Sequence, residues 1–335
     1  MRRRDFAALL LERSGLGGVL RVGAAWRGLL VLCYHRILEG DRRCAGPGRW
    51  SATQDQLDEQ LRLLNRYFEV VAPSDLLDGP ALRDRRLVAV TFDDGYRDNH
   101  ALALPVLRAH GVRAGFFVPT GYVDRPHAAW WDEIAWMVRS SGRPGLPTGR
   151  WLTRPLQFDA RNRHAAIDAL TDVYKRLPGD QTEPFLDFLA EATGSGRRDP
   201  AEAADDWMTW GMLRELCDAG MDIGGHTVNH PVLARLDRDQ QQAEIEGCRR
   251  RLRDELGVAM KLFAYPVGLP GSFDGRTRDC LASAGVELAF SLHGGYTTGI
   301  PWDRYGIRRT SVAVSNAVPA NFRATVTLPQ VFARW

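Results

Sequence analysis

Short, nearly continuous apolar runs alternate along the chain with segments of helical periodicity. Such runs are typical of strands that are buried on both faces of a parallel sheet. They cover residues 28–35, 68–72, 87–92, 114–118, 221–226, 261–265, 286–291 and 307–312. Between them lie helical stripes such as Leu57, Leu61 and Leu64, introduced by Ser51 and Gln54 as a capping box. This order predicts an α/β fold, a distorted (β/α)7-8 barrel with right-handed crossovers.

Residues 121–206 interrupt the alternation. Trp130, Trp131, Ile134 and Met137 form an apolar helical patch, and 160–191 has the pattern of further helices. We therefore expect a helical insertion at about 121–206 within a barrel domain of residues 28–335. Core packing is the expected role of the tryptophans, and sugar stacking is the alternative.

The composition restricts the class of protein. At 335 residues and 44% hydrophobic content, the chain can bury one large α/β core. Its net charge of +3 gives no indication of a nucleic-acid partner. The five cysteines form no CxxC pair and are odd in number, which favours free thiols in a reducing compartment.

Residues 1–27 are expected to form an N-terminal helical segment. The apolar stretch 6–11 is cut short by Glu12 and Arg13, so it does not match a secretory signal peptide. No run reaches the roughly 18 apolar residues of a membrane helix. We expect a cytoplasmic protein with this segment packed on the barrel. The alternative is an amphipathic helix, residues 1–26, lying peripherally on the inner membrane face.

Two acids end the strand at 87–92. Asp93 and Asp94 stand at its carboxyl end, where α/β barrels place their chemistry. Neighbouring strand residues point to opposite faces, so the two carboxylates share a pocket only if the backbone turns, which Gly95 permits. An ordinary Asp-Gly turn is the simpler interpretation of this stretch alone.

Two histidines change that interpretation. His226 and His230 follow another short strand with H-x3-H spacing, and Pro231 keeps His230 out of a helix. With one carboxylate of the upstream Asp pair, they supply three ligands and leave positions open for water and substrate. The pattern predicts a divalent metal site between two strand ends.

Three motifs resemble those of the polysaccharide deacetylases, a carbohydrate esterase family that includes chitin and peptidoglycan deacetylases. They are T-F-D-D-G-Y at 91–96, H-T-x-x-H-P at 226–231 and F-x-x-P-x-G at 263–268. The resemblance spans about Leu30 to Thr310 and implies removal of N-acetyl groups from an N-acetylated glycan, in exopolysaccharide biosynthesis or a related pathway.

The resemblance also implies individual roles. Asp93 would be the general base, and Asp94, His226 and His230 would hold the metal, for which zinc is expected. The segment Tyr265, Pro266, Val267 and Gly268 would contact the substrate and supply backbone donors to an oxyanion hole. Two departures stand out, because the family often has Arg where Ala264 stands and Tyr where Val267 stands.

Three further residues are candidates for the site. His35 ends the first strand, and in branches of the family with Y-H-R at this point it resembles the general acid; His293 is the rival. Because Ala264 replaces the usual Arg, we expect Arg308, or its neighbour Arg309, to orient the base.

Two other functions fit parts of the pattern. Two His and one carboxylate also form the facial triad of iron oxygenases, but their close spacing is absent here and the second Asp would have no role. A glycan-binding scaffold without catalysis is the other alternative, which the complete set of four polar residues disfavours. Metal analysis and acetate release separate these functions.

Overall fold

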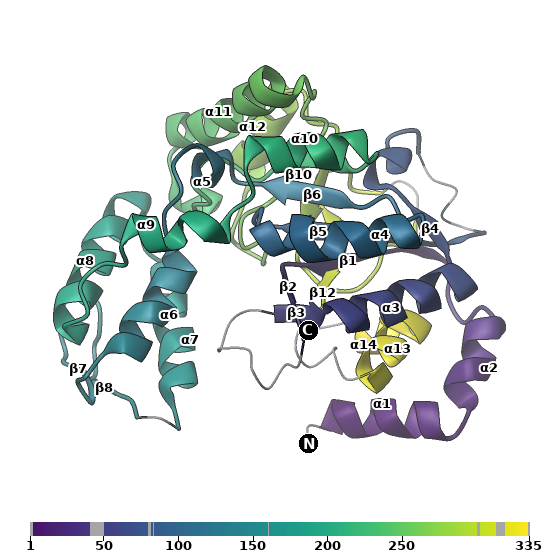
Figure 1. Ribbon diagram of the computed structural model, residues 1–335, viewed down its shortest axis with the longest axis horizontal. Coiled ribbons are helices and arrows are strands. Elements are labelled where there is room, and N and C mark those ends of the chain that lie inside the picture. Colours follow the sequence, from purple (N-terminus) through teal and green to yellow (C-terminus); the bar gives the residue numbers. More distant parts are fainter. Residues whose placement is uncertain are drawn as a thin grey trace.

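Seven parallel strands form a closed barrel in the computed structural model (Figure 1). The structure describes residues 3–40, 50–79, 82, 84–159, 161–299, 302–312 and 319–333. In ring order the strands are β1 (Gly28–Tyr34), β5 (Arg86–Asp93), β6 (Gly115–Val118), β9 (Asp222–Gly225), β10 (Leu262–Ala264), β11 (Leu288–Ser291) and β12 (Ile307–Ser311). Pairing of β12 with β1 closes the ring. The predicted barrel is confirmed.

Apart from the β7–β8 hairpin described below, three short strands of the described residues lie outside the ring. β4 (Glu69–Val71) pairs with the first half of β5, while β6 pairs with its second half, so β5 has three neighbours. β2 (Arg36–Leu38) and β3 (Trp50–Thr53) form a separate parallel pair. The predicted strand at 68–72 therefore belongs to the sheet but not to the barrel wall.

Helices cover the outside of the barrel between successive strands (Figure 1). They are α3 (Gln54–Tyr67), the π-helical η3 (Asn99–Ala103) with α4 (Leu104–Ala109), α10 (Trp210–Asp218), α11 (Arg238–Leu256) and α12 (Gly275–Ser283). Leu57, Leu61 and Leu64 of α3 are buried, as their spacing predicts. Gly257 ends α11 in a left-handed conformation.

The capping box predicted for α3 is wrong by two residues. Thr53 and Gln56 form the box, each side chain accepting the other residue's N–H. Ser51 lies in β3, where its hydroxyl accepts the His35 N–H at 2.9 Å and is not available to a helix.

Alternation along the strands divides the barrel interior from its outer surface. Leu29 and Val31 of β1 belong to the interior apolar cluster, whereas Leu30 and Leu32 pack under the outer helices. The interior cluster comprises Leu29, Val31, Leu76, Leu82, Leu87, Ala89, Phe117, Leu262, Ala264, Leu288, Phe290 and Ile307. At the carboxyl ends of the strands, the inward-facing residues are polar, and they form a layer next to the interior apolar cluster.

The segment between β6 and β9 is mainly helical. It contains α5 (Thr120–Asp124), α6 (Trp130–Ser140), α7 (Arg163–Tyr174), α8 (Thr182–Thr193) and α9 (Pro200–Ala203), with an antiparallel pair of two-residue strands, β7 (Gly145–Leu146) and β8 (Leu156–Gln157). α5, α6, α7 and α8 share an apolar cluster separate from that of the barrel, and the tryptophans Trp130 and Trp131 are buried in it. Figure 1 shows α6, α7 and α8 beside one end of the barrel.

Both ends of the described chain pack together. α1 (Arg3–Arg13) and α2 (Leu16–Val22) lie beside α13 (Pro319–Thr327), which is followed by α14 (Pro329–Phe332) (Figure 1). The segment predicted as one amphipathic helix is thus two helices, separated by Gly15 at a φ of 76°. In the part of the chain that the structure describes, no helix has the length and apolar character needed to span a bilayer.

Candidate metal centre and active site

The two acids at the end of β5 point into the same region because the backbone reverses immediately after the strand. Asp93 occupies an inward position, and Asp94 and Gly95 follow with φ angles of 74° and 72°. The turn predicted at Gly95 therefore begins one residue earlier, at Asp94. A positive φ at a residue other than glycine is a strained conformation that surrounding contacts must hold.

Asp94, His226 and His230 come together in a buried triad. Oδ1 of Asp94 lies 3.5 Å from Nε2 of His226 and 3.4 Å from Nε2 of His230. These separations exceed those of good hydrogen bonds. They match the distance between two ligand atoms of one metal ion, because two atoms about 2.0–2.2 Å from a tetrahedral zinc lie about 3.4 Å apart. The three side chains therefore fit a divalent metal.

The surroundings of the two histidines aim both Nε2 atoms at Asp94. Nδ1 of His226 donates to the Ala264 carbonyl at 2.7 Å, so Nε2 carries the lone pair that a metal requires. His230 has no such bond, since its buried Nδ1 lacks a partner among the described residues. The Trp131 ring packs edge-on against it at 4.5 Å between centroids. Packing, rather than hydrogen bonding, orients the His230 ring.

The loop between the histidines is fixed by α11. The backbone N–H groups of Val228 and Asn229 donate to Glu244 at 2.9 and 2.8 Å. Thr227 adds a hydroxyl that accepts the His230 N–H at 2.9 Å. Asp94, Thr227, His230 and Val267 are four of the five described non-glycine residues with positive φ. Backbone strain is thus concentrated at this site.

The charges of the site favour metal binding. Burial raises the pKa of Asp94, but His226 and the charges of His35 and His230 outweigh burial, and the net pKa lies below its usual value. Burial and the charge of His226 lower the pKa of His230 to about 3. At neutral pH the site therefore presents an anionic carboxylate and a neutral imidazole, which are the forms that bind a metal.

Asp93 is held by an arginine from β12, which is separated from β5 in the ring only by β1. Nη1 and Nη2 of Arg309 each donate to one carboxylate oxygen at 2.7 Å, and both side chains are buried. Burial raises the pKa of Asp93, but the charges of Arg309 and His226 outweigh burial and bring the pKa below its usual value. The carboxyl is therefore ionised at neutral pH. The expectation for Arg308 is wrong: its side chain points outward and contacts the Gly294 carbonyl at 3.4 Å.

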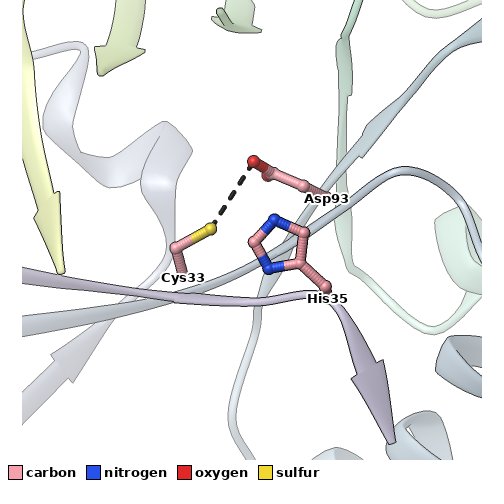
Figure 2. A group of neighbouring side chains, drawn as sticks. All are labelled: Cys33, His35 and Asp93. Carbon is pink, nitrogen blue, oxygen red and sulfur yellow. Dashed lines mark hydrogen bonds between the residues drawn. The ribbon is translucent and has the colours of Figure 1, made fainter. Parts of the chain in front are cut away.

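Cys33 and His35 lie beside Asp93 (Figure 2). The Cys33 thiol donates to Oδ2 of Asp93 at 3.5 Å, and burial raises the thiol's pKa well above its usual value. His35 offers a ring nitrogen within 4.8 Å of both groups. The charge of His35 also acts on both Asp93 and Asp94. His35 is therefore part of the cluster around the acids.

His293 has different neighbours. Its ring stacks on Phe273 with centroids 5.4 Å apart. Burial, Arg308 and Arg278 lower its pKa, and Asp303 raises it by less. Of the two candidate acids, the structure brings His35, and not His293, to the carboxylates.

The segment 265–268 crosses the mouth of the barrel in a tight turn. Val267 has a φ of 64°, and the Gly268 N–H donates to the Pro266 carbonyl at 2.7 Å across it. The Gly268 N–H is thus already used and is not an oxyanion donor. Tyr265 faces away, with its hydroxyl donating to the Tyr305 carbonyl at 2.8 Å. No acceptor among the described residues takes the Val267 N–H.

The sequence left the choice between Arg308 and Arg309 open, and it did not indicate the supporting roles of other residues. Alternation in β12 was the available signal for Arg309: apolar Ile307 faces the interior, so Arg309 faces it too and Arg308 does not. The same parity in β1 places Cys33 inward after Val31. Nothing in the local pattern around Glu244 or Trp131 indicates that either supports the histidine loop.

The family model described as polysaccharide deacetylase matches residues 82–143 and 181–289, just over half of the chain. The first segment contains Asp93 and Asp94, and the second contains His226 and His230. No curated protein matches the sequence.

Several solved structures have the same fold. The Streptococcus pyogenes deacetylase PplD, solved in complex with acetate, is 18% identical with a TM-score of 0.59, over 90% of this chain and 99% of that one. IcaB from Ammonifex degensii is 21% identical with a TM-score of 0.55, over 90% and 97%. The BpsB deacetylase domain from Bordetella bronchiseptica is 17% identical with a TM-score of 0.52, over 84% and 95%.

Proposed function

The chain belongs to the polysaccharide deacetylase family, and from this premise we propose that it uses a divalent metal to remove N-acetyl groups from an N-acetylated sugar or polysaccharide. The observation that carries the proposal is the pairing of two differently held acids. Asp94 faces His226 and His230 at ligand spacing, while Asp93 is turned toward Arg309. One acid is suited to hold an ion and the other to accept a proton.

We take zinc to be the ion. Three protein donors of nitrogen and oxygen with positions left open are the usual catalytic zinc arrangement. An ion bound by Asp94, His226 and His230 would polarise the acyl oxygen and bring the pKa of a bound water to about 7.

Asp93 is the general base of the proposed reaction. Its carboxylate is ionised, and Arg309 fixes the direction of its oxygen atoms. Water gives a proton to Asp93 as its oxygen attacks the acetyl carbon. The Cys33 thiol adds a second donor to Oδ2, which limits rotation of the carboxylate.

Two further groups serve the acyl centre and the leaving group. The Val267 N–H donates to the oxygen that becomes negative during the attack, a role that needs only backbone. When the carbon–nitrogen bond breaks, His35 gives a proton to the departing amine and acetate is released. The absence of the usual tyrosine side chain at Val267 then changes contacts with the sugar but not the reaction.

The test combines metal analysis with acetate release. Purified protein is analysed for metal, stripped with a chelator, reloaded with zinc or iron, and given N-acetylated oligosaccharides of graded length. We expect zinc in the protein and acetate release that is lost on stripping and restored by zinc. Glycan binding without acetate release would instead favour a scaffold. Iron content with oxygen consumption would favour an oxygenase.

A further inference from the structure

The two N-terminal helices expose a concentration of large apolar side chains. Among the described residues six such side chains are exposed, and five of them belong to α1 and α2, with exposed fractions from 51% to 74%. These five are Phe6, Leu10, Leu16, Val19 and Val22. We call their surroundings, residues 4–27, the α1–α2 surface. Figure 1 shows both helices on the side of the molecule away from α6, α7 and α8.

α1 is apolar on two sides. On the inner side, Ala8 is buried against Ala324 and Phe332, and Leu11 packs beside them. On the outer side, Phe6 and Leu10 are exposed. A group of neighbouring exposed apolar side chains marks a surface that contacts a partner or a membrane. No part of the described chain covers Phe6 and Leu10 on the outer side of α1, so this side is a candidate contact surface.

The charges of this segment are strongly one-sided. Residues 1–27 contain six arginines and two acids, a net charge of +4, whereas the whole chain carries +3, so the remainder is slightly negative. Both acids are turned inward: Asp5 accepts from Asn321 at 2.9 Å, and Glu12 pairs with Arg21 at 2.7 Å. The exposed charges of the α1–α2 surface are those of Arg4, Arg13 and Arg27.

We propose that the α1–α2 surface binds the face of a lipid bilayer that contains anionic headgroups. Exposed apolar side chains flanked by arginines have the chemistry of interfacial binding, in which the apolar groups enter the acyl boundary and the cations meet lipid phosphates. A second copy of this chain is a poorer cover, because it would bring two surfaces of net positive charge together.

Docking in this way leaves the active site open. α2 leads into Gly28 at the amino end of β1, whereas Asp93, Asp94 and His226 stand at the carboxyl ends of their strands. α2 therefore lies toward the end of the barrel opposite the metal centre, while α1 packs against α13. The proposal does not depend on the deacetylase reaction.

The test is co-sedimentation of the full chain with sucrose-loaded vesicles, either pure phosphatidylcholine or phosphatidylcholine with phosphatidylglycerol. We expect binding to the anionic vesicles, weakened by salt, and little to the neutral ones. Replacing three exposed side chains (Phe6→Ser, Leu10→Ser and Val19→Ser) removes it. The pair Arg13→Gln and Arg27→Gln weakens it roughly 30-fold, at about fivefold per arginine.

A charge-matched control separates this surface from general attraction. Arg154 and Arg161 are exposed on the helical segment, and changing both to Gln removes the same charge at a distance. This control must bind like wild type. Three results would overturn the proposal: wild-type protein left in solution with anionic vesicles, equal loss in the control, or a wild-type dimer in solution that the serine variant converts to monomer. Acetate release without vesicles checks that the serine variant is folded.

Discussion

Arg309 and Asp93 form a two-point ion pair at the mouth of the barrel, with both nitrogen–oxygen distances at 2.7 Å. β12 supplies the arginine and β5 the acid, and neither strand contacts the other directly in the sheet. Because both groups are buried, loss of either one leaves an uncompensated charge. The pair therefore controls the ionisation and the orientation of Asp93 together.

The first prediction concerns the geometry of this pair. Arg309→Lys keeps the charge but replaces a planar fork with a single ammonium, so the Asp93 carboxylate turns. We expect kcat to fall about 100-fold with KM nearly unchanged, since the misplaced group takes part in the reaction rather than in binding. Arg308→Lys is the matched control, because Arg308 is exposed and donates to the Gly294 backbone carbonyl rather than to Asp93. Equal losses in the two variants would contradict the assignment to Arg309.

The second prediction separates the two acids by their roles. Asp93→Asn removes the proton acceptor and leaves Asp94, His226 and His230 in place, so zinc content is retained while kcat falls by about 10² to 10⁴. His226→Ala removes a ligand, so both zinc and activity are lost. Metal analysis of each purified variant, paired with acetate release, provides the measurement. An active Asp93→Asn enzyme would rule out Asp93 as the base.

The third prediction distinguishes the two candidate acids. His35→Gln slows amide hydrolysis, whereas His293→Gln, whose ring stacks on Phe273 away from the carboxylates, does not. An aryl acetate ester has a leaving group that needs no proton, so His35→Gln should cleave it at nearly the wild-type rate. Loss of both activities in His35→Gln would mean that His35 positions the other groups and does not donate the proton.

The fourth prediction concerns the strained turn. Val267→Gly removes the Cβ from a residue with a φ of 64° and keeps the backbone N–H. Relief of strain stabilises the fold by about 1 kcal/mol, less the packing that the valine side chain provides. Urea denaturation measures the stability, and we expect kcat to stay near wild type. A large drop in kcat would show that the side chain, rather than the N–H, serves the reaction.

The fifth prediction addresses the packing behind His230. Trp131→Ala removes the ring in contact with His230 and the Nε1–H donated to Tyr96 at 2.7 Å. We expect a stability loss of about 3–5 kcal/mol. Zinc affinity should fall about 10- to 100-fold, as for other groups that orient a metal ligand.

Trp136→Ala is the control for that experiment, since Trp136 lies on the same helix and packs at the edge of the same cluster. It should lower stability without changing zinc affinity, as measured by competition with a chelating dye. Similar affinity losses in both variants would mean that any damage to α6 disturbs the site.

The sequence predicted the barrel and the metal triad for one physical reason. Apolar strands that end in Asp93, Asp94 and His226 place their polar residues at one edge of any parallel sheet. That argument needs only the order of residues along each strand. The sequence was therefore sufficient to predict the barrel and the clustering of Asp94 with the two histidines.

The supporting residues could not be found in this way. Whether Arg308 or Arg309 faces Asp93 depends on the inward parity of β12, which the sequence shows only once Ile307 is known to be interior. The contacts of Trp131 with His230 and of Glu244 with the histidine loop join segments about 100 and 15 residues apart, and no local pattern reports them. The capping error at Ser51 arose because a tertiary bond to His35 took its hydroxyl.

The cluster formed by α6, α7 and α8 also includes Tyr96, two residues after the proposed ligand Asp94, and Trp131, which touches the proposed ligand His230. The surroundings of the proposed metal site are thus formed partly by the core of the insertion. On heating, we do not expect the insertion to unfold at a lower temperature than the barrel while the active site stays intact. The two cores should lose their structure in one cooperative step, and a metal that protects one should protect both.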